Sequence, residues 1–266
     1  MKGRRGKLWR LFWLADNPTL QWENCRGILG RMCNHYRNIP GAQKLLATWR
    51  EYISWSLDAA VPPEMDSLDE DVWSRREAAV VRQSEEAGGA FVDQMTWGVP
   101  LSLPGKRPGT KVSKYITNVR NLTSPFWRSM LMKPEQRCLV PFTTFAEPKI
   151  GAGREEHWFT VKDREVAAFA GVWRWAAEVG PAAKQAAPQD LFGNLEDAGE
   201  SKADDPGPAK VFAFLTCEPN PLVAPLHPKA MPVILAEADY QTWLSADWEE
   251  AGKLAVPFPS QLMGVG

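Results

Sequence analysis

A methionine stands directly before a cysteine, at positions 32 and 33, in the segment ILGRMCNHYRN. If translation starts at Met32, methionine aminopeptidase can remove that residue, because cysteine is small, and Cys33 becomes the first residue. An N-terminal cysteine has an α-amine with a pKa of about 7.7–8.0 and a thiol with a pKa of about 8.5. The amine captures an aldehyde as an imine, and the thiolate then closes a five-membered thiazolidine ring. The Met-Cys pair therefore predicts covalent chemistry with an aldehyde.

An internal Cys33 would be an ordinary residue, since lone cysteines are commonly small buried apolar side chains. With residues 1–32 attached, its nitrogen is an amide and cannot attack an aldehyde. Segment 1–31 starts basic and turns apolar like a signal peptide, but Arg10 interrupts the apolar run and no small-x-small cleavage site follows. We expect 1–31 to be a leader outside the fold, from either a wrongly assigned start, which we favour, or a segment that is removed.

Three further polar residues have the types that proton transfer requires. Glu147 ends the apolar run VPFTTFA, where desolvation would raise its pKa toward neutrality and suit it to acid–base work. His227, in PLHPK, exchanges a proton near neutral pH. Asn118 can hydrogen-bond a sugar or the new ring. The alternatives are a surface carboxylate at a strand end, a structural loop histidine and a turn asparagine.

The elements that must position these residues are mostly strands. Apolar runs rich in β-branched residues predict strands at 78–83, 90–99, 137–147, 157–163, 166–175, 210–218 and 231–235. Helices are expected at 42–57, at 124–133, where a Ser cap and a Pro open the run, and at 237–248. Loops are expected at 61–73 and 100–111, and a mobile surface insertion at 180–209. Many strands with few helices between them favour an α+β domain, mainly antiparallel β.

Composition sets limits on the class of protein. The 266 residues are 44% hydrophobic and 24% charged with net charge −1, which is typical of a globular chain with one core. Four cysteines without a CxxC pair and only three histidines argue against a structural zinc site, and we expect no cofactor. Scattered cysteines fit a reducing cytoplasm. No stretch reaches the roughly 18–20 apolar residues of a membrane helix.

Positive charge is concentrated in one part of the chain. Between 101 and 149, nine basic residues face only two acidic ones, Glu135 and Glu147. This pattern favours an anionic partner such as a phosphate backbone. The alternative, left open here, is a solvated face that the acidic segment 178–205 balances in space.

The segment MCNHYRN resembles the amino terminus of the SRAP family, the SOS response-associated peptidases or abasic-site processing proteins. Four later blocks resemble this family in the right order: TWGV (96–99), ITNVRNLTSPFWR (116–128), RCLVPFTTFAEPK (137–149) and FAFLTCEPNPLVAPLHPKAMPVIL (212–235). The resemblance implies a barrel-like, mainly antiparallel domain over 32–250, with the insertion near 180–209 inside it. Residues 251–266 are then expected to form a C-terminal tail.

The resemblance also implies a function. Family members bind single-stranded DNA and react with abasic sites, whose ring-opened sugar exposes an aldehyde, and the thiazolidine crosslink protects the lesion during DNA repair and the SOS response. It implies catalytic roles for Cys33, Asn118, Glu147 and His227. It implies a DNA contact for Arg120, with weaker DNA-binding candidates at Asn34, His35, Arg37, Trp97 and Trp127. We expect a monomer in the cytoplasm, at the nucleoid when it is bound to DNA.

Two other functions remain open at the level of sequence. A cysteine peptidase would use Cys33 as nucleophile and His227 as base, on its own leader or on other peptides, and would not require a free α-amine. A nucleic-acid-binding module without chemistry would be indifferent to Cys33→Ala.

Overall fold

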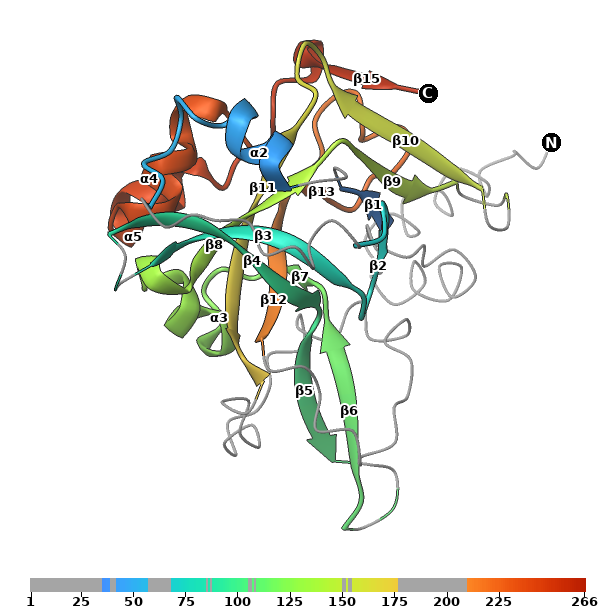
Figure 1. The fold of residues 1–266 in the computed structure, drawn as a ribbon. Helices are drawn as coiled ribbons and strands as arrows, with labels where there is room; N and C mark the ends of the chain where they lie inside the picture. Colours follow the sequence, from blue (N-terminus) through green and yellow to red (C-terminus); the bar gives the residue numbers. More distant parts are fainter. Residues whose placement is uncertain are drawn as a thin grey trace, which may run out of the picture.

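The computed structural model describes residues 35–38, 42–56, 68–84, 86, 88–104, 107, 109–149, 152, 155–176 and 210–266. The leader 1–31, Cys33, Asn34 and the insertion at 180–209 lie outside the described residues. Two sheets dominate the rest, and short helices cover one side of them (Figure 1). The expected α+β class with mainly antiparallel strands is confirmed. No helix among the described residues is long and apolar enough to cross a bilayer.

The larger sheet curls until its strands form a closed ring. Strand β12 pairs with β4 on one side and with β11 on the other, and β3 and β8 complete the circle. Short strands β7, β13 and β14 pair with its members. The bounds are β3 Glu77–Ser84, β4 Gly89–Trp97, β7 Asn118–Val119, β8 Arg137–Phe142, β11 Ala167–Trp175, β12 Lys210–Cys217, β13 Met231–Pro232 and β14 Ile234–Leu235.

The second sheet has five antiparallel strands in the order β15-β10-β9-β1-β2. They are β1 His35–Arg37, β2 Asp71–Trp73, β9 Thr144–Pro148, β10 Glu156–Val161 and β15 Met263–Val265. The chain leaves the ring and enters this sheet at Thr143, whose backbone N–H donates to the carbonyl of Arg37 at 2.9 Å. The single strand predicted at 137–147 is therefore two strands, β8 and β9, in different sheets.

A two-stranded hairpin extends from the ring (Figure 1). It consists of β5 (Val99–Pro104) and β6 (Lys111–Ile116), paired in antiparallel register from Val99↔Ile116 to Pro104↔Lys111. The loop predicted at 100–111 is thus mostly a hairpin strand and the connection after it. Pro100 and Pro104 are compatible with a strand here, because a two-stranded ribbon leaves half of its backbone donors unpaired.

Aromatic side chains fill the space between the two sheets. Phe145 stacks on Phe159 at 5.0 Å, and Phe142 stacks on Phe169 at 3.8 Å. Tyr36 of β1 joins this cluster edge-on to Phe169 and is fully buried. Because every ring is contributed by a strand, the core fixes how the two sheets sit against each other.

The helices are shorter than the sequence predicts. They are α2 (Ala42–Thr48), α3 (Pro125–Leu131), α4 (Tyr240–Ser245) and α5 (Trp248–Ala251), with 3-10 turns η2 (Pro134–Gln136), η6 (Glu237–Asp239), η7 (Gly252–Leu254) and η8 (Ser260–Leu262). Helix α3 starts at Pro125 as predicted, with Ser124 at the N-cap position, but the Ser124 side chain makes no capping hydrogen bond. The helix expected over 42–57 ends at Thr48 and continues as turns.

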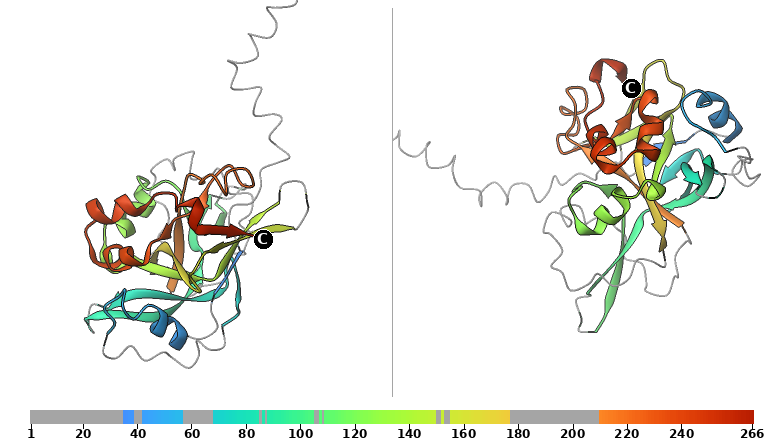
Figure 2. Two further views of the ribbon diagram at one scale, coloured as in Figure 1. Left: turned by 90° about the horizontal axis from the view of Figure 1, so that it is seen from above. Right: turned by 90° about the vertical axis from the view of Figure 1, so that its left-hand side faces the viewer.

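Residues 251–266, expected to form a tail, are part of the fold instead. Phe258 and Met263 are buried against the aromatic core. Strand β15 lies beside β10 (Figure 2), and the N–H of Gly266 donates to the carbonyl of Trp158 at 3.0 Å. The sequence did not show this, because two anchoring residues in an otherwise irregular segment produce neither helical nor strand periodicity.

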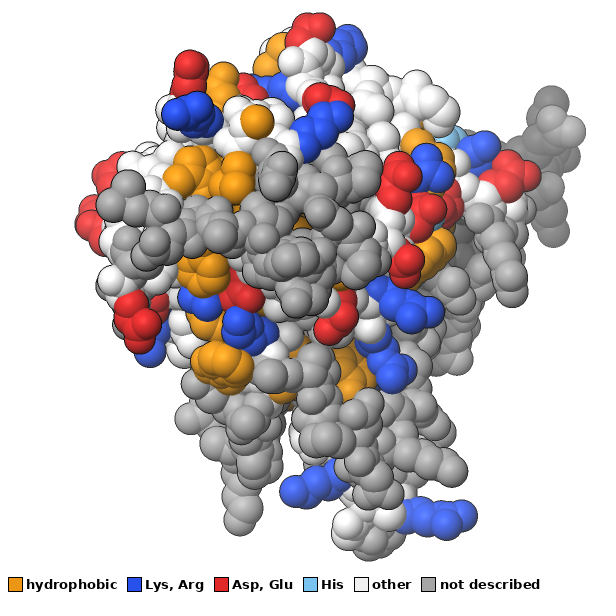
Figure 3. Space-filling model, viewed as in Figure 1, with side chains coloured by type: hydrophobic (Ala, Val, Ile, Leu, Met, Phe, Trp, Pro, Cys, Tyr) orange, Lys and Arg blue, Asp and Glu red, His pale blue; other side chains and the backbone are white. Residues whose placement is uncertain are grey.

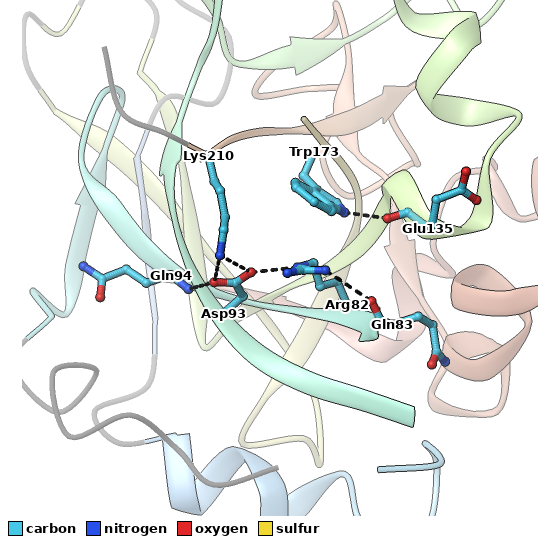
Figure 4. A network of polar contacts seen from close by, with 7 residues as sticks. All are labelled: Arg82, Gln83, Asp93, Gln94, Glu135, Trp173 and Lys210. Atoms are coloured by element: carbon cyan, nitrogen blue, oxygen red, sulfur yellow. Dashed lines mark hydrogen bonds and ion pairs between the residues drawn. The ribbon is translucent and has the colours of Figure 1, made fainter. Parts of the chain in front are cut away.

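A buried polar network joins three strands of the ring (Figure 4). Asp93 of β4 accepts from Arg82 Nε of β3 at 2.7 Å and from Lys210 Nζ of β12 at 2.8 Å. The Arg82 guanidinium lies 4.3 Å from the ring centre of Phe91 and 4.4 Å from that of Trp173. Asp93 is nearly buried, so this carboxylate between two cations fixes the pairing of β3, β4 and β12.

Candidate active site

Glu147, on β9, is the most unusual carboxyl group among the described residues. Its side chain is 1% exposed, and neither carboxyl oxygen has a hydrogen-bond partner within the described part of the chain. Burial raises the pKa of Glu147 well above its usual value, and the nearby charge of Glu156 raises it further. Glu147 therefore keeps its proton to higher pH than an exposed glutamate, as a general acid must.

His227 lies next to this carboxyl group. It is 3% exposed, and its Nδ1 is 3.6 Å from Oε2 of Glu147. Nδ1 also lies 2.8 Å from the carbonyl oxygen of Ala230, and because a carbonyl only accepts, Nδ1 carries the hydrogen. In the neutral ring the lone pair is then on Nε2, so His227 can accept a proton there.

The turn that carries His227 is positioned by Asn220, a residue that the sequence reasoning missed. The Asn220 Oδ1 accepts from the backbone N–H groups of Leu222 and Val223, and its Nδ2 donates to the carbonyl of Phe258 at 2.7 Å. The His227 backbone N–H in turn donates to the carbonyl of Val223 at 2.8 Å. An Asn-Pro dipeptide at 220–221 was the available signal, since it is typical of a turn.

Strand β7 brings Asn118 and Arg120 to the same region. Asn118 pairs with Phe214 of β12 in parallel register, and its Nδ2 donates to Oγ1 of Thr117 at 3.0 Å. Arg120 is exposed and donates from its guanidinium to the carbonyl of Lys229 at 3.0 Å. Since Lys229 is two residues after His227, this bond joins the β7 segment to the His227 turn.

The two tryptophans expected to stack on DNA are core residues. Trp97 is fully buried, stacks on Phe214 at 5.1 Å, and donates from Nε1 to the carbonyl of Thr117 at 3.0 Å. Trp127 is buried on α3. Neither ring can meet a base without unpacking the core, so we leave both out of the DNA-contacting set. Trp97 instead orients the backbone just before Asn118.

Two residues of the predicted site, Cys33 and Asn34, lie outside the described residues, but the strand that follows them is described. β1 begins at His35, two residues after Cys33, and His35 pairs with Ala146 of β9. Glu147 is the next residue of β9. Arg37, at the end of β1, is exposed in part, pairs with Asp71 at 2.9 Å and lies over the ring of Trp158.

The described cysteines are poor nucleophiles. Cys138 is fully buried, and burial raises the pKa of its thiol. Burial also raises the pKa of Cys217 to about 12. A thiol that keeps its proton is neither a good nucleophile nor a good metal ligand. No group of three or more His, Cys, Asp or Glu side chains in the described part of the chain is arranged to hold a metal ion.

The basic segment 101–149 divides into exposed and buried positions. Arg137 is fully buried, donates to the carbonyl of Ala246, and has a pKa that burial lowers to about 10. Exposed side chains are those of Arg107, Lys111, Arg120, Arg128 and Lys133. Basic side chains also occupy the far end of the β5–β6 hairpin (Figure 3).

A family model identifies the family of this chain, and solved structures share its fold. The family model described as SOS response associated peptidase (SRAP) matches residues 32–265. A solved protein from Bordetella bronchiseptica is 21% identical with a TM-score of 0.58, over 88% of this chain and 98% of that one. One from Bacteroides thetaiotaomicron is 22% identical with a TM-score of 0.59, over 88% and 90%. A phage-related protein from Bordetella bronchiseptica is 14% identical with a TM-score of 0.55, over 88% and 93%. No curated protein matches the sequence.

Proposed function

Because this chain belongs to the SOS response associated peptidase (SRAP) family, we propose that it processes abasic sites in single-stranded DNA by forming a thiazolidine crosslink through Cys33. The single observation that supports this most is the buried pair of Glu147 and His227, 3.6 Å apart, in which Glu147 belongs to β9, the strand paired with the one that follows Cys33. An acid and a base at one place are what the ring-opening and condensation steps require.

In this proposal His227 opens the sugar. It takes the proton of the C1′ hydroxyl and returns it to the ring oxygen as the C1′–O4′ bond breaks, which leaves an aldehyde. The α-amine of Cys33 then attacks the aldehyde carbon, and one proton moves from the nitrogen to the aldehyde oxygen, which becomes a hydroxyl group. Protonated Glu147 donates to the hydroxyl group, which leaves as water, and the carboxylate takes a proton from the nitrogen to leave the imine.

The thiol completes the ring. Its sulfur bonds to the imine carbon, and the thiol proton ends on the nitrogen. The sum of the steps is one aldehyde plus one N-terminal cysteine giving one thiazolidine and one water, with no oxidant or reductant. Asn118, near the His227 turn, would hydrogen-bond the sugar or the ring.

Binding before the chemistry would depend on the phosphate backbone. We assign it to Arg120, Arg37 and Asn34, with the basic end of the β5–β6 hairpin as a further contact. For single-stranded DNA, removing one cation that binds a phosphate should reduce the slope of log affinity against log salt by about 0.7. Arg120→Gln is expected to lower that slope by about this amount. We further propose that the protein acts as a cytoplasmic monomer at the nucleoid.

The test uses protein that begins at Cys33 and an oligonucleotide with one abasic site. The expected product is a heat-stable adduct whose mass is the sum of the two reactants less one water. Cys33→Ser keeps the amine but should form only a labile imine, and a chain with residues 1–32 still attached should form nothing. Absence of the adduct from the protein that begins at Cys33 would refute the proposal.

The family's description as a peptidase favours a second candidate. A cysteine peptidase would use the sulfur of Cys33 and the imidazole of His227 as its nucleophile and base. Acetylating the α-amine while leaving the thiol free separates the two functions. Crosslinking should disappear in the acetylated protein, whereas peptide hydrolysis should persist.

A further inference from the structure

His35 occupies the centre of a row of side chains that crosses four strands. It pairs with Trp73 of β2 and with Ala146 of β9, and Ala146 pairs with Trp158 of β10. Side chains in register on antiparallel strands share one face of the sheet. The His35 ring stacks on Trp73 at 3.6 Å and meets the edge of Trp158 at 4.7 Å. The small side chain of Ala146 leaves the room for this contact.

Both nitrogens of His35 meet carboxylates. Nδ1 lies 2.8 Å from Oε2 of Glu156, and Nε2 lies 3.0 Å from Oδ1 of Asp71. The ring is only 5% exposed. A carboxylate oxygen only accepts, so the two bonds form at the same time only when each ring nitrogen carries a hydrogen. We call His35, Asp71, Trp73, Glu156 and Trp158 the His35 cluster.

The charges around the cluster are balanced. Besides His35, the cation Arg37 donates to Asp71 at 2.9 Å. The hydrogen bond from Arg37, together with that from His35, lowers the pKa of Asp71 against the opposing effect of burial. On β9, the titratable group that this cluster influences is Glu147, whose pKa burial raises and the charge of Glu156 raises further. The His35 ring thus contacts a carboxylate, Glu156, whose charge acts on the buried acid.

The cluster has a mechanical effect on β1. This strand has only three residues, and short strands near a chain start fray unless they are tied down. The bonds of His35 connect β1 to β2 and, across β9, to β10. They hold His35 opposite Ala146, which precedes Glu147 in β9. Cys33 is two residues before His35 in the chain.

We propose that His35 is a positioning residue for the reaction at Cys33, because its two carboxylate bonds hold β1 in the register that presents the start of the mature chain to Glu147. This inference rests on the proposed function. His35 does not touch the reacting atoms and acts through β1.

The experiment separates DNA binding from the covalent step. Variants His35→Gln and His35→Arg, each beginning at Cys33, are compared with the parent protein and with Lys162→Gln, a control just after β10. Affinity for an oligonucleotide without a lesion is measured first, and then the single-turnover rate of adduct formation at saturating abasic DNA. Because the DNA is saturating, any change in affinity does not affect this rate, and His35→Gln should slow the covalent step on the order of tenfold to a hundredfold, the effect of a small misplacement.

The conservative variant supplies the test that a merely structural role would not pass. A guanidinium donates to two carboxylates at once, so His35→Arg should recover most of the rate, and Lys162→Gln should react like the parent.

The outcomes distinguish the two proposals. If the parent protein forms no adduct, the proposed function fails and this inference fails with it. If the parent reacts and folded His35→Gln reacts at the same rate, only the role of His35 is refuted. If His35→Gln does not fold, the milder variant Glu156→Gln removes one of the two bonds of His35. A covalent rate like that of the parent protein for Glu156→Gln would also refute the role of His35.

Discussion

Glu147→Gln should make the folded protein less sensitive to pH while it impairs the reaction. The Glu147 side chain is enclosed, and neither of its carboxyl oxygens has a hydrogen-bond partner among the described residues. Its ionised form is therefore destabilised in the folded state, and its pKa is raised, first by burial and then by Glu156. Glutamine has nearly the same shape and cannot ionise.

The sign and the limiting size of the effect follow from proton linkage. Above the unfolded pKa of about 4.3 and up to the raised folded pKa, the folded protein binds the Glu147 proton and the unfolded chain does not. The stability that this proton gives is present in full below about pH 4 and is lost as pH rises through the folded pKa. One proton limits the slope to about 1.4 kcal/mol of unfolding free energy per pH unit.

Urea unfolding of both proteins between about pH 5 and 8 measures this slope. Other titrating groups contribute equally to both proteins, so the difference in unfolding free energy isolates Glu147. With an m value of about 2–3 kcal/mol/M for a domain of this size, the full slope moves the relative midpoint by roughly 0.5 M per pH unit. Glutamine should become the more stable variant toward high pH.

If the difference in unfolding free energy between the parent protein and Glu147→Gln stays constant across the measured pH range, the claim that Glu147 is buried with a raised pKa is refuted. His227→Gln provides the control, because its Nδ1 is 3.6 Å from the carboxyl group and a cation there would oppose the effect. In the His227→Gln background, the difference in unfolding free energy between proteins with and without Glu147→Gln should depend on pH at least as steeply as it does when His227 is present. A flatter dependence would show that the histidine, not the carboxyl group, is the titrating residue.

Three other predictions concern the scaffold. Asp93→Ala leaves Arg82 and Lys210 without the carboxylate that they share and should lower the unfolding free energy by about 3–5 kcal/mol. An unchanged melting temperature would contradict this prediction. Gly171→Ala places a methyl group 2.8 Å from Sγ of Cys138 and should lower the unfolding free energy by about 1–3 kcal/mol through overpacking. A urea midpoint equal to that of the parent protein would show that β8 and β11 can move apart to accommodate the methyl group. Removing 256–266 deletes β15 and two buried apolar side chains, and limited proteolysis should then digest the whole domain, whereas a stable core would argue that this segment is dispensable.

Much of the fold could be predicted from apolar runs, because strand alternation is a local signal. The strands at 78–83, 90–99 and 166–175 appear close to their expected places as β3, β4 and β11. The sequence could not show where a strand changes sheet: RCLVPFTTFAE is one continuous apolar run, and the break at Thr143 comes from pairing with β1. Likewise, Pro100 and Pro104 made the segment that forms β5 look like a loop in the sequence.

The site was predictable only in part. Glu147 and His227 were chosen from their residue types and from the resemblance to a family, and the structure brings them together. Nothing local could predict that distance, because it depends on a turn that Asn220 holds. The cluster around His35 was equally hidden, since its two carboxylates come from β2 and β10, far along the chain. Trp97 and Trp127 were predicted to contact DNA but are buried, because a sequence does not reveal which tryptophans lie in the core.

The five-stranded sheet joins the earliest and the latest described parts of the chain, since it contains both β1 and β15. A ribosome makes β1 before its partner β9, and the edge of β10 stays open until β15 has left the exit tunnel. Throughout translation, an N-terminal cysteine would therefore meet cellular aldehydes before its acid and base partners are in place. The sheet is complete only once β15 has been made and paired with β10, so under the proposed function any selectivity for a DNA lesion over free sugars begins only after that pairing.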